Sequence, residues 1–213
     1  MKHLVLILAL LFGTNLAGAA EIRFDTNWQE QRFSLFSKNR YSFGGNRLGV
    51  RSDGSVSMAY IRLGEPYWPA KQAAWSWSVS EGVPATDLTK KGGDDRNLSV
   101  YAVFLPESKA DQLKDAGIRT LLGEDSARVL VYVWGGEHSR GDMLASPYLG
   151  ERGRTIVLRP SSTGAFAENV NLASDYERAF GPVSGVLVGL AVSADSDDTD
   201  TSIRANIEGL QVN

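Results

Sequence analysis

The sequence predicts an all-β protein, an antiparallel β-sandwich or jelly roll with one or two short helices. Segments of strand length that alternate apolar and polar residues recur along the chain, and turn residues separate them at short intervals. Helical patterns are confined to two short stretches. A parallel α/β fold would need several more helices between its strands, so the sequence favours the sandwich.

The predicted strands are marked by apolar alternation and by β-branched and aromatic residues. Residues 73–79 alternate tryptophan and serine. Residues 98–104 and 127–134 are apolar in both phases, which is typical of strands in the middle of a sheet or between two sheets. The other predicted strands are residues 55–63, 154–160, 184–194 and 202–212. In the strand 202–212 the alternation of apolar and polar residues shifts by one position at Gly209, where we expect a β-bulge.

Two stretches carry helix signals. Residues 106–117 predict one short helix, with Glu107 in the first turn and Gly117 at the end. Residues 174–181 predict a helix of one or two turns with Ser174 as the N-cap.

The first 20 residues, 1–20, are predicted to be a secretory signal peptide. A lysine precedes an apolar run from Leu4 to Phe12, and small residues follow. This run is well short of the roughly 20 residues that span a bilayer, and no other segment predicts a transmembrane helix. We therefore expect cleavage near Ala19-Ala20, a periplasmic or secreted location, and one β-sandwich domain over residues 21–213.

Composition excludes several classes of function. The chain has a net charge of −3, whereas a nucleic-acid-binding domain needs a basic face, so we expect no nucleic acid partner. The chain has no cysteine, which excludes thiol nucleophiles, cysteine metal sites and a lipid anchor on cysteine. His138 is the single histidine beyond the signal peptide, so a zinc site with several histidine ligands is excluded.

Two acidic loops form the candidate metal site. ADSDDTDTS at 194–202 directly follows an apolar predicted strand, and GGDDRN at 92–97 directly precedes another. If these strands are antiparallel neighbours, both loops share one rim of the sandwich. Calcium takes six to eight oxygen ligands, which such loops supply, but the same residue types also form solvated turns. The candidate calcium ligands are Asp94, Asp95, Asp195 and Asp197.

Aromatic residues are the candidate ligand contacts. Tyr67 and Trp68 lie between two prolines in residues 65–72, where a stiff loop would present them for binding. Trp75 and Trp77 lie on one face of a predicted strand. Each pair has two interpretations, packing within the sandwich or stacking on the apolar face of a sugar ring.

Five motifs in order carry a resemblance to a known family. They are WSWSV at 75–79, KGGDDRNLSVYAVF at 91–104, VYVW at 131–134, ENVNLASDYERAFG at 168–181 and VGLAVSADSDDTDTSIRANIEGLQV at 188–212. Together they resemble a bacterial family of secreted domains of unknown function. The resemblance implies a secreted all-β domain similar to carbohydrate-binding sandwiches, and it implies no activity.

Three functions are compatible with these residues. The favoured one is a non-catalytic module that binds a polysaccharide or another envelope component through loop aromatics and acidic side chains. The second is a structural or assembly domain stabilised by a cation. The third is a polysaccharide hydrolase or lyase that pairs Asp94 or Asp95 with Asp197 or Asp198. An enzyme is disfavoured because no nucleophile, base or metal triad is recognisable.

Overall fold

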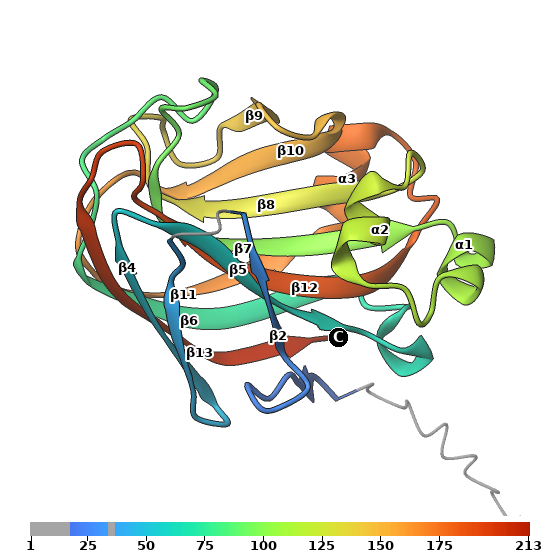
Figure 1. The fold of residues 1–213 in the computed structure, drawn as a ribbon. Helices are drawn as coiled ribbons and strands as arrows, with labels where there is room; N and C mark the ends of the chain where they lie inside the picture. Colours follow the sequence, from blue (N-terminus) through green and yellow to red (C-terminus); the bar gives the residue numbers. More distant parts are fainter. Residues whose placement is uncertain (1–17, 34–36) are drawn as a thin grey trace, which may run out of the picture.

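The protein is a sandwich of two stacked β-sheets (Figure 1). The computed structural model describes residues 18–33 and 37–213. The six-stranded sheet has the order β11 (Gly164–Asn171), β6 (Gln72–Glu81), β13 (Ser202–Val212), β4 (Arg47–Asp53) and β3 (Arg40–Phe43), and β1 (Ala20–Glu21) pairs with β13. The seven-stranded sheet has the order β2 (Gln29–Arg32), β5 (Val56–Arg62), β12 (Val186–Asp195), β7 (Arg96–Leu105), β8 (Arg128–Trp134), β10 (Gly150–Arg159) and β9 (Met143–Ser146).

The all-β sandwich of jelly-roll type is confirmed, with one departure from a purely antiparallel arrangement. Every predicted strand is present, as β5, β6, β7, β8, β10, β12 and β13. The described strand pairs are antiparallel except β8 and β10, which run parallel because the chain passes through the edge strand β9 before it forms β10. The β-bulge at Gly209 is also confirmed, since its φ is 61° and the pairing of β13 with β6 shifts register there.

The helices differ from the sequence prediction in number and bounds. The stretch 106–117 forms only α1 (Glu107–Gln112), and Gly117 then begins a further helix, α2 (Ile118–Gly123), which was not predicted. The third helix, α3 (Leu172–Phe180), begins two residues before the predicted cap. Its N-cap is Asn171, whose side chain accepts a hydrogen bond from the backbone N–H of Ser174, so the assignment of Ser174 as the cap was wrong.

The tryptophans of β6 belong to the core between the sheets. Trp75 and Trp77 are 3% and 2% exposed, with ring centroids 5.5 Å apart. Trp77 also packs against Trp134 of β8 at 5.5 Å. Stacking of Trp75 and Trp77 on a sugar is therefore contradicted, because their faces are already covered by the opposite sheet.

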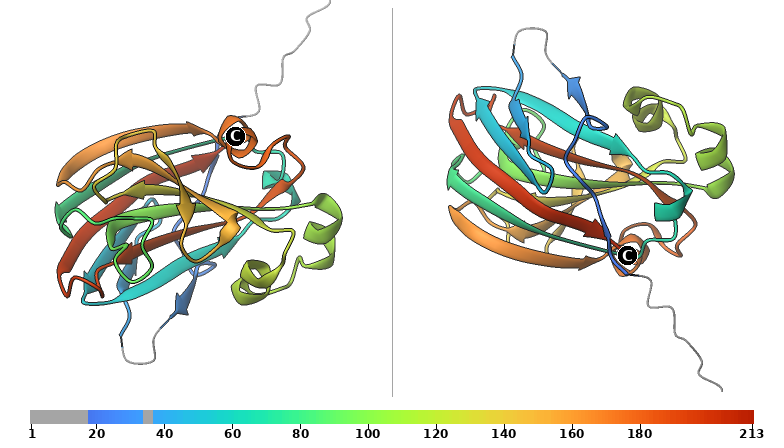
Figure 2. Two further views of the ribbon diagram at one scale, coloured as in Figure 1. Left: turned by 90° about the horizontal axis from the view of Figure 1, so that it is seen from above. Right: turned by 90° about the horizontal axis from the view of Figure 1, so that it is seen from below.

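A second apolar cluster lies on the outer face of the seven-stranded sheet. It includes Tyr101 and Val131, and α1 and α2 cover one end of it. These helices follow the end of β7, so they lie at the opposite end of the sandwich from the start of β7 (Figures 1 and 2). That second end of the face has no helix over it among the described residues, and it carries the candidate site.

The beginning of the chain is described only in part. Most of the predicted signal peptide, residues 1–17, lies outside the described residues. The first described strand pairs Ala20 with Val212 and Glu21 with Gln211. Within the part of the chain that the structure describes, no helix has the length and apolar character needed to cross a membrane.

Asn39 connects the two sheets beside the end of β12. The residue is fully buried, and its Nδ2 donates to the carbonyl oxygen of Ala194 at 2.8 Å and to that of Ser57 at 3.1 Å. Its Oδ1 accepts from the hydroxyl of Ser55 at 2.9 Å. One amide side chain therefore satisfies groups of β12 and β5 from a position directly before β3.

We predict that Asn39→Ala lowers the free energy of unfolding by about 2–4 kcal/mol, because it removes three hydrogen bonds from a fully buried position. Urea denaturation followed by tryptophan fluorescence measures the change. Asn169→Ala, at an exposed position of β11, is the control and should change it by less than about 0.5 kcal/mol. Equal effects of the two substitutions would contradict the role given to Asn39.

Candidate ligand-binding site

The candidate site forms where the end of β12 lies beside the start of β7. The apolar residues of β12 are buried on both faces, so this strand runs through the middle of the sheet between β5 and β7. In the antiparallel register, Asp195 at the end of β12 is opposite Arg96 at the start of β7. The prediction that the two acidic loops share one rim is confirmed.

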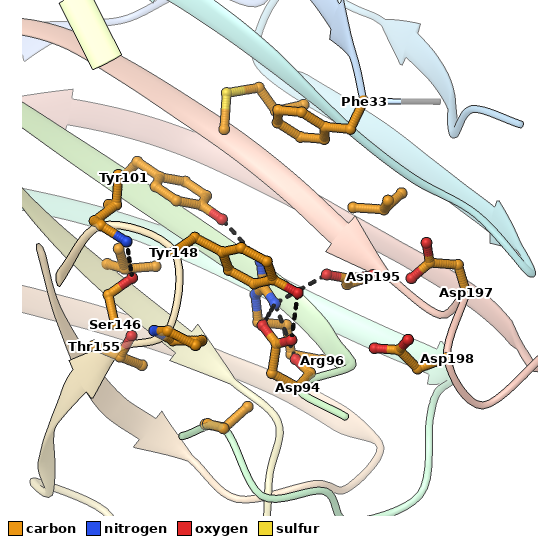
Figure 3. Close-up of a pocket in the computed structure, with 16 residues that line it drawn as sticks. Phe33, Asp94, Arg96, Tyr101, Ser146, Tyr148, Thr155, Asp195, Asp197 and Asp198 are labelled. Carbon is orange, nitrogen blue, oxygen red and sulfur yellow. Dashed lines mark hydrogen bonds and ion pairs between the residues drawn. The ribbon is translucent and has the colours of Figure 1, made fainter. Parts of the chain in front are cut away.

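Arg96 is the centre of the site, although the sequence analysis did not select it. Its Nη1 donates to Asp94 Oδ2 at 2.9 Å and to Asp195 Oδ2 at 3.0 Å. Its Nη2 donates to the hydroxyl oxygen of Tyr101 at 3.0 Å, and its Nε donates to Ser99 Oγ at 2.8 Å. The guanidinium therefore joins the loop before β7, β7 itself and the end of β12 in one network (Figure 3).

Burial and neighbouring charges shift the pKa values of this ion pair. Burial lowers the pKa of Arg96, but Tyr101, Asp195 and Asp94 outweigh burial and raise it above its ordinary value. Burial raises the pKa of Asp195 to about 8, with Arg96 opposing the rise and Asp197 adding to it. Asp195 Oδ1 is buried and has no hydrogen-bond partner among the described residues. The raised pKa reflects the cost of burying this carboxyl, whose Oδ2 accepts from Arg96.

Asp95, in the acidic loop before β7, holds the other acidic loop, residues 194–202, in place. This side chain is fully buried and accepts hydrogen bonds from the backbone N–H groups of Asp198 and Thr199, at 3.3 Å and 2.7 Å. The hydroxyl of Thr199 donates to the same carboxylate. Asp95, Asp197 and Asp198 bring carboxylate oxygens within 4.8 Å of one another. Burial raises the pKa of Asp198, and the nearby Asp95 and Asp197 raise it further.

The structure divides the four predicted calcium ligands into two groups. Asp94 and Asp195 are ion-paired with Arg96, so a positive charge already faces them. Asp95 and Asp197 lie instead with Asp198, which was not among the predicted calcium ligands. Calcium binding stays a prediction, and the residues that fit it best are Asp95, Asp197 and Asp198, since three carboxylates at this spacing can contact one ion.

A cavity of about 380 Å³ opens beside Arg96 and the acidic loops. Tyr148, in the loop between β9 and β10, stands at its mouth with 54% of its surface exposed, and its hydroxyl donates to Asp94 Oδ1 at 3.0 Å (Figure 3). Phe33, also 54% exposed, lies on the other side. Burial raises the pKa of Tyr148 to about 12, so its hydroxyl keeps its proton at neutral pH. The rest of the lining is largely apolar and includes Val56, Met58, Leu88, Val131 and Leu149.

The predicted aromatic loop does not reach this cavity. Tyr67 and Trp68 are half-buried, and Trp68 Nε1 donates to the carbonyl oxygen of Leu63 at 3.2 Å. The carbonyl oxygen of Trp68 accepts from the N–H of Leu187, at the start of β12, which lies about 26 Å along the strand from Asp195. A shared site for these aromatics and the acidic loops is therefore contradicted, because they lie at opposite ends of the sandwich.

Sequence reasoning missed the aromatic residues that do line the cavity. Tyr148 follows Pro147 in a loop, the same signal that drew attention to Tyr67 after Pro66, and it had not been weighed. Tyr101 lies inside a predicted strand, and alternation alone does not show which face of that strand is open. Phe33 carries no local signal of exposure.

The fold and the cavity define a jelly-roll β-sandwich protein with an acidic, aromatic-edged cavity on its larger sheet. The chain belongs to the family described as "Protein of unknown function (DUF3047)", which matches residues 26–211. The family resemblance seen in the sequence thus agrees with this membership at the level of an uncharacterised family. No curated protein matches the chain.

Several solved structures have a similar fold at low sequence identity. The xyloglucanase domain of NopAA, a type three effector from Sinorhizobium fredii, in complex with cellobiose, is 11% identical with a TM-score of 0.48, and the match covers 87% of this chain and 92% of that one. A cellulase derived from Cel12A of Rhodothermus marinus is 8% identical with a TM-score of 0.47, covering 92% and 99%. A loop-swap mutant of Xyn11A from Necallimastix patriciarum is 9% identical with a TM-score of 0.46, covering 94% and 97%.

We predict that Asp195 makes stability fall as pH rises. Its folded-state pKa of about 8 lies above the value near 3.9 of an unfolded aspartate, so its contribution is fully present below pH 4 and lost through pH 8. The slope should approach about 1.4 kcal/mol per pH unit in this window. Urea unfolding of wild type and Asp195→Asn at pH 5 to 8, with chelator present, measures the difference. Parallel curves for the two proteins would rule the effect out, and Asp111→Asn on α1 is the control.

We predict that calcium raises the melting temperature through Asp95, Asp197 and Asp198. An ion that binds only the folded state at 100 times its Kd adds about 2.7 kcal/mol, which corresponds to about 5–10 °C for a domain of this size. Thermal melts with excess calcium and with chelator test this. The double variant Asp197→Asn, Asp198→Asn should lose the shift. Identical melting of wild type in both conditions would mean that the loop is a solvated turn.

Proposed function

We propose that this chain is an exported, non-catalytic β-sandwich module that binds a glycan in the cavity beside Arg96. The observation that carries the proposal is the position of Tyr148. Its ring is exposed at the mouth, while its hydroxyl is hydrogen-bonded to a carboxylate buried below it. An aromatic face and fixed polar groups therefore line one space of about 380 Å³, within the size range of ligand pockets.

The two surfaces of a sugar ring match the two kinds of lining. The C–H face packs on an aromatic ring, which Tyr148 supplies. The hydroxyl groups need fixed polar partners, and the exposed carboxylates of Asp197 and Asp198 accept hydrogen bonds from them. Because Arg96 already holds its neighbours in place, binding would cost little further ordering of side chains.

Charge narrows the class of glycan. The carboxylates of the two acidic loops outnumber the positive charges beside the cavity. These positive charges are Arg96 and Lys91, whose Nζ lies 5.4 Å from the centre of the Tyr148 ring. A uronate would meet repulsion in this cavity, whereas an ammonium group would gain ion pairs. The proposed ligand is therefore a neutral or amine-bearing sugar.

The exported location is part of the proposal and rests on the sequence. Residues 1–20 have the charged start, apolar run and small residues of a signal peptide. A chain that carries no cysteine needs no disulfide to fold after export. The glycans of the cell envelope and its surroundings are the ligands that such a protein meets.

A polysaccharide hydrolase is the second candidate, and one observation favours it. Asp94 and Asp195 each bind the same nitrogen of Arg96, so their bonded oxygens lie within about 6 Å of each other, which allows the roughly 5–5.5 Å separation of retaining glycosidases. The raised pKa of Asp195 also suits a general acid. Binding is preferred because Asp94 is held by Arg96 and Tyr148, and Asp195 by Arg96 with its other oxygen buried, so neither carboxylate is free to act as a nucleophile.

We predict that Tyr148→Ala lowers glycan affinity at least tenfold, which is about 1.4 kcal/mol, because the stacking face is lost. A glycan array with and without calcium selects the ligand, and titration calorimetry gives the Kd. The affinity of Tyr148→Phe should lie between those of wild type and Tyr148→Ala, since this variant keeps the ring and loses the hydrogen bond to Asp94. Phe43→Ala, a 36% exposed aromatic on the other sheet, is the control.

Other outcomes would replace the proposal. Release of reducing ends by wild type, abolished in Asp195→Asn, would establish the hydrolase instead. Failure to retain any glycan, combined with a calcium-dependent melting temperature, would favour a structural or assembly domain. Equal loss of affinity in Tyr148→Ala and Phe43→Ala would show that the cavity is not the binding site.

A further inference from the structure

The outer face of the six-stranded sheet carries a row of arginines across neighbouring strands. Arg40 of β3 is directly opposite Arg51 of β4, and Arg51 is directly opposite Arg204 of β13. All three residues are exposed and point away from the core, since Leu48 and Val50 occupy the inward positions of β4. Three like charges thus stand side by side on three adjacent strands.

Such a row opposes folding unless something compensates it. Directly opposite residues in a sheet have Cβ atoms only about 4.5–5.5 Å apart, and like charges at that spacing are destabilising. Arg204 is compensated by Glu81 at 2.9 Å and by Asp53 at 3.8 Å. Arg40 and Arg51 have no ion-pair partner within residues 18–33 and 37–213. Their guanidinium groups remain free to bind an anion.

A hollow of about 660 Å³ adjoins the arginine row. Gly49 lies between Arg47 and Arg51 on the outward face of β4, and its missing side chain opens the floor of the hollow. Arg47 stands at the far end, about 13 Å along the strand from Arg51. Its Nε donates to Asn206 Oδ1 at 3.0 Å and is ion-paired with Glu208 at 3.3 Å, so the unpaired positive charge of this face, among the described residues, is that of Arg40 and Arg51. Hydroxyl and amide groups complete the lining, from Ser42, Ser80 and Asn206.

We propose that this face, defined by Arg40, Arg51 and Arg204 and the hollow beside them, is a second binding site, and that it takes an acidic polysaccharide. Guanidinium groups bind carboxylates through paired, charge-assisted hydrogen bonds. The hydroxyl and amide groups of the hollow bind sugar hydroxyls, which an isolated inorganic anion does not offer. The site is separate from the cavity beside Arg96, since it lies on the other sheet and selects the opposite charge.

The experiment measures binding of decagalacturonic acid by titration calorimetry in 50 mM and 300 mM sodium chloride. Wild type should bind, and the affinity should fall with salt because the contacts are ionic. The double variant Arg40→Gln, Arg51→Gln should lose at least tenfold in affinity at 50 mM. Its control is Arg119→Gln, Arg178→Gln, which removes the same charge from two helices and should stay within twofold of wild type.

A second measurement separates a ligand site from a merely structural patch. Removing the middle charge, by Arg51→Gln, should raise the melting temperature of the free protein by about 1–3 °C, because it relieves repulsion on both sides. The same substitution should weaken decagalacturonate binding. A lower melting temperature would show that Arg51 is held by stabilising contacts and would contradict the inference.

Further measurements decide which anion this face binds and whether binding there is independent of the cavity beside Arg96. Tyr148→Ala should bind decagalacturonate as wild type does, whatever happens to glycan binding in the cavity. A loss of decagalacturonate binding in Tyr148→Ala would overturn the second site. Equal or tighter binding of inorganic polyphosphate, or of phosphatidylglycerol vesicles, would overturn the assignment to an acidic polysaccharide, as would no binding of decagalacturonate at 50 mM salt.

Discussion

The architecture around the cavity depends on one buried cation. The guanidinium of Arg96 lies at the start of a central strand and contacts two carboxylates and two hydroxyl groups from separate parts of the chain. A buried charge of this kind is stable only while its partners stay in place, and loss of one member leaves the others uncompensated. The same ion pairs therefore hold the end of β12 beside the start of β7 and fix the wall of the cavity.

Most of the fold could be predicted from the sequence, and most of the site could not. The strands and the shared rim follow from local patterns, because apolar runs mark central strands and an acidic loop directly follows or precedes each. Arg96 could not be recognised, because its burial depends on Asp195, which is 99 residues away in the chain. Alternation at Trp75 and Trp77 likewise showed a shared face without showing which face was covered. The helix α2 was missed because six residues are too few for a periodic signal.

The two outward faces of the sandwich have opposite chemistry, and the period-two pattern of strands explains how both can exist. In β4, Leu48 and Val50 fill the core while Arg47 and Arg51 face outward. In β7, Leu98 and Val100 fill the same core while Ser99 and Tyr101 lie on the other face and accept hydrogen bonds from Arg96. Polar residues on either outward face can therefore be substituted without altering the packing between the sheets.

The positions of the last two strands constrain when the protein can fold. Strand β12 lies between β5 and β7 in one sheet, and β13 lies between β4 and β6 in the other, so residues 186–213 occupy the interior of both sheets. Until this segment has been synthesised, neither sheet can close, and the earlier strands have only partial pairing. Contacts between such distant segments make folding slow. A chain without residues 186–213 would therefore leave β4, β5, β6 and β7 with unpaired edges, and such edges are sites where strands of other chains can add.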